Sequence, residues 1–232
     1  MIMLKKDLNS RHPLGTREDE IDILSKGEFG AVLSRAGVGK TAFLVQLAIN
    51  TMMKNRNVLH ISMNDPVDKI TLWYEELFQH LTQRNAVEEA NQLWESLLPH
   101  RFIMTFRVAG FSVPRLIERL TDLTGQDIFH PDMVIIDGLE FNESTRECLA
   151  DLKSLAGEQS FHAWFSVHTH RDEQTPQDGI PSRLMNVEDL FDIALQLHPS
   201  GTDIHIKPLK GPSRIISGMT HLTLDASSML IK

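Results

Sequence analysis

The sequence predicts an α/β fold in which a mainly parallel central sheet is flanked by helices. Two observations support this prediction. Short β-branched or apolar runs alternate with longer stretches of helical periodicity, which is the pattern of a parallel sheet covered by helices. The composition is globular, since 41% of the 232 residues are hydrophobic and 31 acidic side chains face 23 basic ones. At about 150 residues per domain, this length suits one large domain.

Composition and charge also disfavour several classes of protein. The single cysteine, Cys148, allows neither an internal disulfide nor a multi-cysteine zinc site, so a cytoplasmic location is expected. The residues before Lys5 and Lys6 are too few for a signal peptide. No apolar run approaches the ~18 residues that span a bilayer, so no membrane partner is expected. A net charge of −8 gives no general attraction to phosphate polymers, which disfavours nucleic acid as a partner.

The first five strands of the predicted sheet are runs of β-branched or apolar residues. The fourth is apolar almost throughout, as expected at the centre of a sheet. Residues 1–20 contain few apolar anchors and are expected to form a loosely held arm before a single domain over 21–232. In chain order, the five strands are expected at residues 29–34, 57–63, 101–108, 132–137 and 162–169.

Helices are expected between these strands because apolar side chains recur there at helical spacing. Pro66 suits the first turn of the second helix with Asp65 as its cap, and Ser112 with Pro114 opens the third. The expected helices cover residues 40–53, 67–98 with an interruption near Asn85, 112–123 and 144–156.

The last part of the chain is expected to add a C-terminal antiparallel extension to the sheet. Residues 171–186 are polar and contain two prolines and a glycine, which predicts a mobile surface loop. Three strand-like runs follow with no helix predicted between them, and turn residues separate them, so hairpins are expected at one edge of the sheet. These runs are residues 190–197, 203–209 and 221–224.

A phosphate-binding loop follows the first strand. Residues 34–41 read SRAGVGKT, and only the first departs from the usual pattern, in which Gly stands in place of Ser34. Gly37 and Gly39 let backbone N–H groups turn toward phosphate oxygens. Lys40 would reach the β- and γ-phosphates, and the Thr41 hydroxyl would bind Mg²⁺ at the start of the helix. The predicted nucleotide-binding residues are Ser34, Arg35, Ala36, Gly37, Val38, Gly39, Lys40, Thr41 and Ala42. The alternative is a glycine-rich turn that opens a helix without a ligand.

Nucleotide binding with Mg²⁺ also requires an acidic residue at the end of a buried strand. Asp137 has this position, directly after four apolar residues. On its own the pattern also describes a residue that ends a strand in a turn. Together with the loop about a hundred residues upstream, it predicts that Thr41 and Asp137 hold Mg²⁺. ATP or ADP and Mg²⁺ are therefore the expected ligands.

Over about residues 21–224, the order of these motifs resembles the RecA-like P-loop ATPases, especially their KaiC-like and replicative-helicase branches. Ile23-Leu24 before Gly27 resembles the segment ahead of the family's loop, and residues 60–65 resemble its second strand. The resemblance implies a RecA-like core with closing hairpins, in which Lys207 or Lys210 reaches the nucleotide of a neighbouring subunit. It therefore implies a homo-oligomer.

The catalytic position departs from the family's pattern. In the relatives, a Glu after the second strand orients the attacking water, but Asn64 stands here and cannot take a proton. The other common position, directly after the magnesium aspartate, holds Gly138. The remaining candidates for catalysis are Asp65, Glu140 and His168, so hydrolysis is predicted to be slow relative to binding.

Two of these candidates have other interpretations. Glu140 also fits an exposed residue of a loop or helix start. His168 matches the family's polar sensor, which hydrogen-bonds to the γ-phosphate or the water, but a packed histidine is an alternative. His168 and His170 share one face of a strand and could bind a metal, which the lack of neighbouring cysteines disfavours.

Three functions remain in competition. A slow or regulatory ATPase that acts as a nucleotide-dependent switch is favoured. The second is a DNA-binding accessory ATPase of recombination or helicase loading, and the third is a non-hydrolysing structural partner of another protein. The loop 171–186 holds only two arginines against three carboxylates, which leaves little charge to neutralise DNA phosphates. These residues are Arg171, Arg183, Asp172, Glu173 and Asp178.

Overall fold

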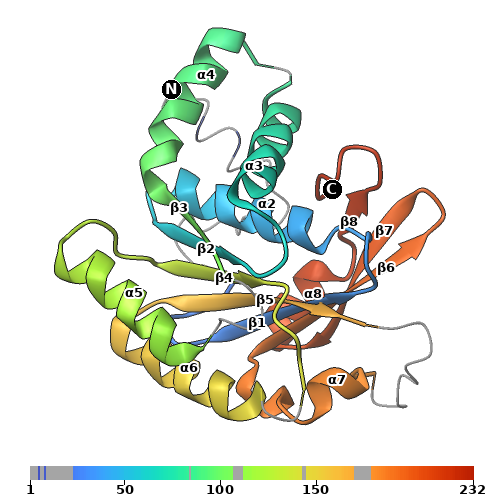
Figure 1. Ribbon diagram of the computed structural model, residues 1–232. Coiled ribbons are helices and arrows are strands. Elements are labelled where there is room, and N and C mark those ends of the chain that lie inside the picture. The colour runs from blue at the N-terminus through green and yellow to red at the C-terminus, as the bar shows by residue number, and fades with distance from the viewer. Residues whose placement is uncertain are drawn as a thin grey trace.

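The computed structural model describes Lys5, Leu8 and residues 23–83, 85–106, 112–142, 145–169 and 179–232, with the backbone only at Arg214. Within them lies an eight-stranded sheet of order β3-β2-β4-β5-β1-β6-β7-β8 (Figure 1). This confirms the α/β class and the mainly parallel sheet. The strands are β1 (Phe29–Ser34), β2 (Val58–Ser62), β3 (Arg101–Thr105), β4 (Met133–Asp137), β5 (His162–His168), β6 (Ile193–Ser200), β7 (Asp203–Lys210) and β8 (Thr223–Asp225).

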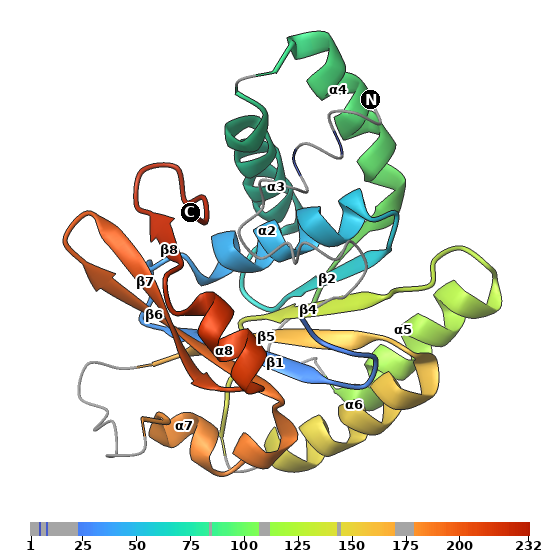
Figure 2. The ribbon, with the colours of Figure 1, turned by 180° about the vertical axis from the view of Figure 1, so that it is seen from behind.

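Helices cover both faces of the sheet. The three helices α2, α3 and α4 lie on one face, and α5 and α6 lie on the other (Figure 1, Figure 2). The interruption predicted near Asn85 separates α3 from α4. The helices are α2 (Lys40–Met53), α3 (Val67–Thr82), α4 (Val87–Leu97), α5 (Val113–Gly125), α6 (Thr145–Gln159), α7 (Ser182–Met185) and α8 (Ser213–Met219), with 3₁₀ turns η1 (Leu98–His100) and η3 (Glu188–Leu190).

The two faces of the sheet hold two apolar cores. In β1, Val32 packs into the core beneath α2, α3 and α4, whereas Phe29, Ala31 and Leu33 pack into the core beneath α5 and α6. This alternation follows from the two-residue period of a strand. Leu8 also belongs to the first core, with 5% of its surface exposed, and Lys5 Nζ donates a hydrogen bond to Asn55 Oδ1 at 2.5 Å. The rest of the predicted arm lies outside the described residues.

A close contact between β1 and β5 fixes the register of these two strands. Gly30 pairs with Trp164, and a Cβ atom at Gly30 would lie 2.5 Å from the indole ring of this buried residue. Only glycine leaves room for the ring. The same register pairs Ser34 with His168 at the carboxyl ends of the two strands. The packing of the core therefore places the start of the phosphate loop beside His168.

The direction of the late strands corrects one prediction. β6 pairs with β1 in parallel, and only β7 runs antiparallel to its neighbours β6 and β8. The expectation that the whole segment from residue 190 is antiparallel was wrong for β6. The reason is that β5 and β6 lie on opposite sides of β1, so the chain between them must cross back to the other edge, as parallel strands require. Of the loop predicted over 171–186, α7 occupies residues 182–185, and residues 171–178 lie outside the described part.

Two local predictions near prolines were also wrong. A helix, α8, separates β7 from β8 where a hairpin was expected, because Pro212 starts a helix with its fixed φ instead of a tight turn. At α3, Pro66 and not Asp65 is the N-cap, and the Asp65 carboxylate accepts a hydrogen bond from Lys69 Nζ at 2.8 Å. The Ser112 cap of α5 is confirmed, since its side chain accepts a hydrogen bond from the Arg115 backbone N–H. No described helix is both long and apolar enough to cross a bilayer.

Candidate nucleotide-binding site

The loop between β1 and α2 has the backbone geometry that phosphate binding requires. Gly37 and Gly39 have φ angles of 75° and 108°, in the left-handed region that favours glycine. Gly39 has a second constraint, because a Cβ atom there would lie 3.2 Å from Met229 Sδ. The loop leads directly into α2, whose first N–H groups and positive dipole point toward a bound anion.

The C-terminal residues pack against this helix. The buried Gln46 side chain in α2 donates a hydrogen bond to the Met229 carbonyl at 2.6 Å and accepts one from the Ile231 N–H at 2.8 Å. The C-terminus accordingly lies near α2 (Figure 1). These contacts hold Met229 against Gly39, so the end of the chain supports the loop from the side.

The Lys40 amine lies inside the loop. Its Nζ donates hydrogen bonds to the carbonyl oxygens of Ser34 at 2.9 Å and of Arg35 at 3.0 Å. Burial lowers the pKa of Lys40, and the nearby Asp137 carboxylate partly opposes this shift. The loop is thus folded around a cationic group that can move to a phosphate oxygen.

Asp137 is the centre of a hydrogen-bonded cluster at the carboxyl end of β4. Thr41 Oγ1 donates a hydrogen bond to Asp137 Oδ2 at 2.7 Å, and Ser166 Oγ donates one to Asp137 Oδ1 at 2.5 Å. The Gly138 N–H in turn donates to Ser166 Oγ at 2.8 Å. A hydroxyl and a carboxylate at this distance, beside a phosphate loop, form the pair that can hold Mg²⁺ together with nucleotide phosphates and water.

Ser166 is a site residue that the sequence analysis missed. The available signal was a hydroxyl side chain in the middle of an otherwise apolar strand. Within the described residues, no group of three or more His, Cys, Asp or Glu side chains could hold a metal ion. A magnesium ion at Thr41 and Asp137 would therefore need phosphate oxygens to complete its coordination. The predicted alternative of a metal pair falls partly outside the described residues, because His170 is not among them.

A cavity of about 520 Å³ opens in front of this cluster. It brings together Lys40, Asp137 and two of the three predicted catalytic candidates, Glu140 and His168. Asp65 is not among the lining residues, and its carboxylate faces Lys69 instead. The residues that line the cavity are Ala36, Lys40, Asn64, Asp137, Gly138, Leu139, Glu140, Phe141, Ser166, His168 and Arg183.

The two positions that lack a catalytic carboxylate meet in space. A Cβ atom at Gly138, whose φ is 90°, would collide with the Asn64 amide group. Asn64 therefore lies directly over the backbone that follows Asp137, at the edge of the cavity. Any side chain larger than hydrogen at position 138 would displace it.

His60, on β2, is a buried neighbour of the site. Its Nδ1 lies 3.1 Å from the Tyr74 hydroxyl, and its Nε2 has no hydrogen-bond partner among the described residues. Burial lowers the pKa of His60 to about 4, although the Asp137 carboxylate opposes the shift. His60 is therefore neutral at pH 7 and lies outside the cavity that holds His168.

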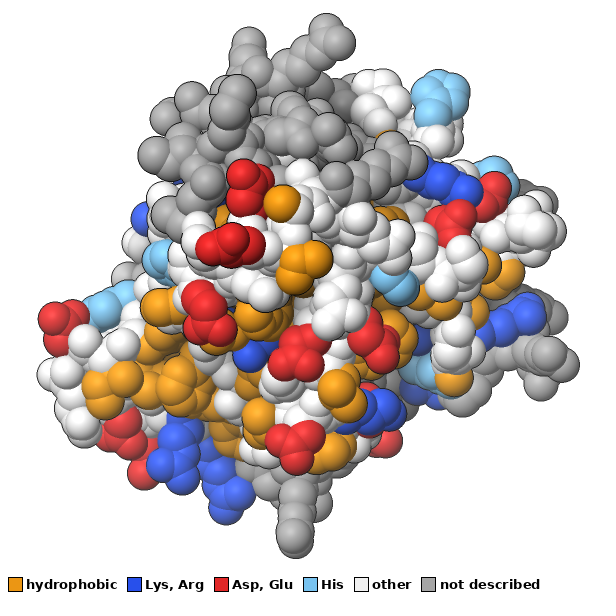
Figure 3. Space-filling view, turned by 90° about the horizontal axis from the view of Figure 1, so that it is seen from above, with side chains coloured by type: hydrophobic (Ala, Val, Ile, Leu, Met, Phe, Trp, Pro, Cys, Tyr) orange, Lys and Arg blue, Asp and Glu red, His pale blue; other side chains and the backbone are white. Residues whose placement is uncertain are grey.

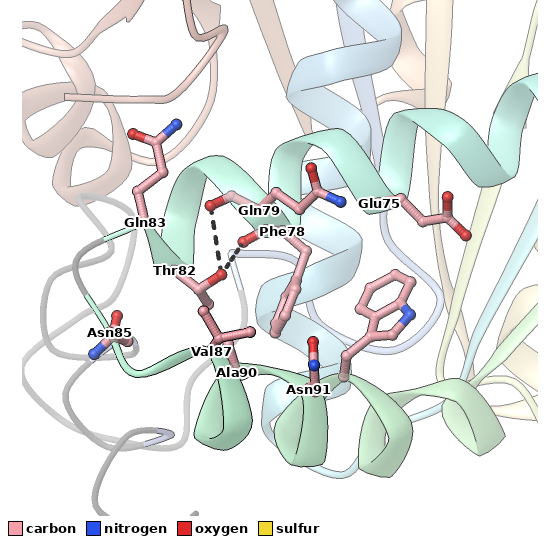
Figure 4. A pocket seen from close by; sticks show the side chains of 10 residues that line it. Glu75, Phe78, Gln79, Thr82, Gln83, Asn85, Val87, Ala90 and Asn91 are labelled. Atoms are coloured by element: carbon pink, nitrogen blue, oxygen red, sulfur yellow. Dashed lines mark hydrogen bonds between the residues drawn. The ribbon is translucent and has the colours of Figure 1, made fainter.

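A second cavity, of about 390 Å³, lies between α3 and α4 (Figure 4). Its wall is made of apolar and amide side chains, with Glu75 as the one charged residue among those described. Thr82 closes one end of it, with its hydroxyl donating to the Phe78 carbonyl at 2.8 Å. Because it offers no cation to a phosphate, this cavity is unsuited to a nucleotide.

Comparison with known proteins bears on the fold. No protein-family model and no curated protein matches the sequence. Among solved structures, the ATPase domain of a replicative helicase matches with a TM-score of 0.58 and 21% identity, over 82% of this chain and 79% of that chain. The chain has the RecA-like P-loop fold. This confirms the predicted architecture, while the KaiC-like branch stays a prediction. Since 447 solved chains match, the fold alone does not select one function.

The two lysines near the closing hairpin have different surroundings. Lys210 Nζ donates a hydrogen bond to the Glu188 carbonyl at 2.7 Å, which ties β7 to η3. The Lys207 side chain lies on β7 and is exposed. Of the two residues predicted to reach a neighbouring subunit, Lys207 is therefore the one whose side chain faces outward.

Proposed function

We propose that this protein binds ATP with Mg²⁺ and acts as a nucleotide-dependent switch with slow or regulated hydrolysis. The observation that supports this most directly is the 2.7 Å hydrogen bond between Thr41 and Asp137, beside Lys40. It joins the two predicted magnesium ligands from elements 96 residues apart. In this proposal, Lys40 and the N–H groups of the loop bind phosphate oxygens, and Mg²⁺ supplies the charge that Asp137 needs nearby.

Titration calorimetry with the full chain tests this proposal. ATP is expected to bind in the presence of Mg²⁺, and removal of Mg²⁺ with EDTA is expected to weaken it. Asp137→Asn keeps the shape of the side chain but removes its charge, so it should reduce the Mg²⁺ dependence by about 10- to 100-fold, as for other groups that orient a metal's ligands. Failure of the folded wild type to bind ATP under either condition would exclude the proposal.

The role of a regulatory ATPase is favoured over that of a DNA-binding accessory protein. The helices α3 and α4 carry six carboxylates and one lysine among their described residues. In the view from above, acidic side chains lie over the middle of this face, and basic ones lie mainly toward its edge (Figure 3). DNA binding depends largely on neutralising phosphates. A gel shift of single-stranded DNA that weakens steeply with salt would favour the alternative.

We also propose that the chain forms a homo-oligomer in which Lys207 reaches the nucleotide of a neighbouring subunit. The outward position of Lys207 supports this proposal, since within its own chain no described contact uses its amine. Light scattering with and without ATP is expected to give a mass above that of one chain. A monomer at every concentration would remove the role of Lys207 in a neighbouring site.

The proposal leaves open a role for another protein. A non-hydrolysing structural partner would use the same binding residues, because Lys40, Thr41 and Asp137 serve binding and not proton transfer. Pull-down of partner proteins with and without ATP distinguishes a switch from a constant structural contact. The cytoplasmic location also stays part of this proposal and rests on the single cysteine, Cys148.

A further inference from the structure

The short helix α7 is held firmly in place at the edge of the nucleotide site. Leu184 is fully buried in the core beneath α5 and α6. On the following segment, the Arg146 guanidinium donates hydrogen bonds to the Asn186 carbonyl and to both carboxylate oxygens of Asp189, each at 2.7 Å. Lys210 holds the Glu188 carbonyl from β7. Three parts of the fold, α6, β7 and the core, therefore fix the position of α7.

Arg183 lies next to Leu184 on this anchored helix and lines the nucleotide cavity. Its side chain is half-buried, and Lys40, Asp137 and His168 line the same cavity. Among the described lining residues, Lys40 and Arg183 are the only lysine or arginine. Lys40 reaches the cavity from the phosphate loop, whereas Arg183 enters from the segment between β5 and β6.

The cavity gives an arginine at this place a defined chemical partner. ATP differs from ADP by one phosphoryl group and its negative charge, and Asp137 and Glu140 make the cavity itself unfavourable for an anion without additional cations. A guanidinium group can donate two parallel hydrogen bonds to phosphate oxygens, which a lysine amine cannot do in a fixed geometry. A fixed arginine can thus recognise the last phosphate separately from the loop that binds the others.

We propose that Arg183 contacts the γ-phosphate from within the same chain and makes the site prefer ATP to ADP. The inference rests on the proposed function and specifies how that site distinguishes its two nucleotide states. It assigns to α7 a role that differs from that of Lys207, which would act on a neighbouring subunit. Because Arg183 lies on a segment fixed by Arg146 and Lys210, its position does not depend on assembly.

Calorimetric titration of the full chain with ATP and with ADP, each with Mg²⁺, tests the proposal. Arg183→Ala is expected to weaken ATP binding by roughly tenfold or more, because a charge-assisted contact to phosphate is lost. ADP binding should change by less than about threefold, since ADP lacks the contacted group. Arg183→Lys should lie between the two, because it keeps the charge but not the planar pair of donors.

Met185→Ala is the matched control. Met185 lies on the same helix, has 53% of its surface exposed and does not line the cavity, so both affinities should stay at the wild-type values. Thermal melting checks that each variant is folded, and Arg183→Lys decides the question if Arg183→Ala is not.

Two outcomes would overturn the role of Arg183: equal weakening of ATP and ADP, or no change in either. A folded Lys40→Ala variant that keeps full ATP affinity would instead overturn the nucleotide site itself. The two failures are therefore distinguishable.

Discussion

The Lys40→Ala variant will lose ATP binding while it keeps its fold. The amine is the cation that the phosphate loop encloses, and its bonds to the Ser34 and Arg35 carbonyls place it within the loop. A hydrogen bond from a charged donor is worth about 1.5–3 kcal/mol, and two of them to phosphate oxygens would be lost. The expected loss of affinity is on the order of a hundredfold or more, measured by calorimetric titration with ATP and Mg²⁺.

Arg35→Ala is the control for this variant. Its side chain is exposed and does not line the cavity, although its carbonyl accepts a hydrogen bond from Lys40. Removing the Arg35 side chain keeps that carbonyl, so ATP affinity is expected to change little. Thermal melting of both variants separates a lost ligand contact from a lost fold. A folded Lys40→Ala variant with unchanged affinity would reject the assignment of the site.

Steady-state turnover of ATP will be slow in the wild type and will rise in Asn64→Glu. The expected wild-type rate is below about one per second, because no carboxylate occupies the two usual positions, Asn64 and Gly138. Asn64 lines the cavity, so a glutamate there would carry a carboxylate toward the phosphate end of the site. A general base typically contributes ~10²–10⁴-fold, and an imperfectly placed one should still raise the rate by about tenfold or more.

Asn64→Gln has the same length as glutamate without its charge, so it should leave the rate low. Asp65→Ala should also leave it unchanged, because the Asp65 carboxylate is bonded to Lys69 and lies outside the cavity lining. Glu140→Gln tests the remaining carboxylate of the cavity besides Asp137. A wild-type rate well above one per second would refute slow hydrolysis, and its loss in Glu140→Gln would then identify the base.

The nucleotide site shows how far the sequence reaches. The phosphate loop could be predicted because its parts are contiguous: Gly37 and Gly39 are required by local backbone geometry, and Lys40 follows them directly. Asp137 could be predicted from a general property of parallel sheets, whose carboxyl ends meet at one edge. The hydrogen bond between Thr41 and Asp137 agrees with this prediction.

Residues brought from distant parts of the chain were beyond such reasoning. Ser166 contacts Asp137 only because β4 and β5 are neighbours in register. Asn64 and Gly138 touch because β2 and β4 are paired, with Ser62 opposite Asp137. Arg183 appeared in the sequence as part of a polar loop, and its place in the cavity results from the buried Leu184 and the clamp formed by Arg146.

By itself, the sequence determined the α/β class, most element positions and the phosphate loop, because periodicity and glycine conformation act over a few residues. Only the tertiary structure decided the direction of β6 and the presence of α8. The direction of β6 depends on which side of β1 the chain reaches, and Pro212 permits either a turn or a helix start until α8 packs against β7. The choice of which polar side chains share the cavity was decided in the same way, because it depends on pairing between strands that lie far apart in the chain.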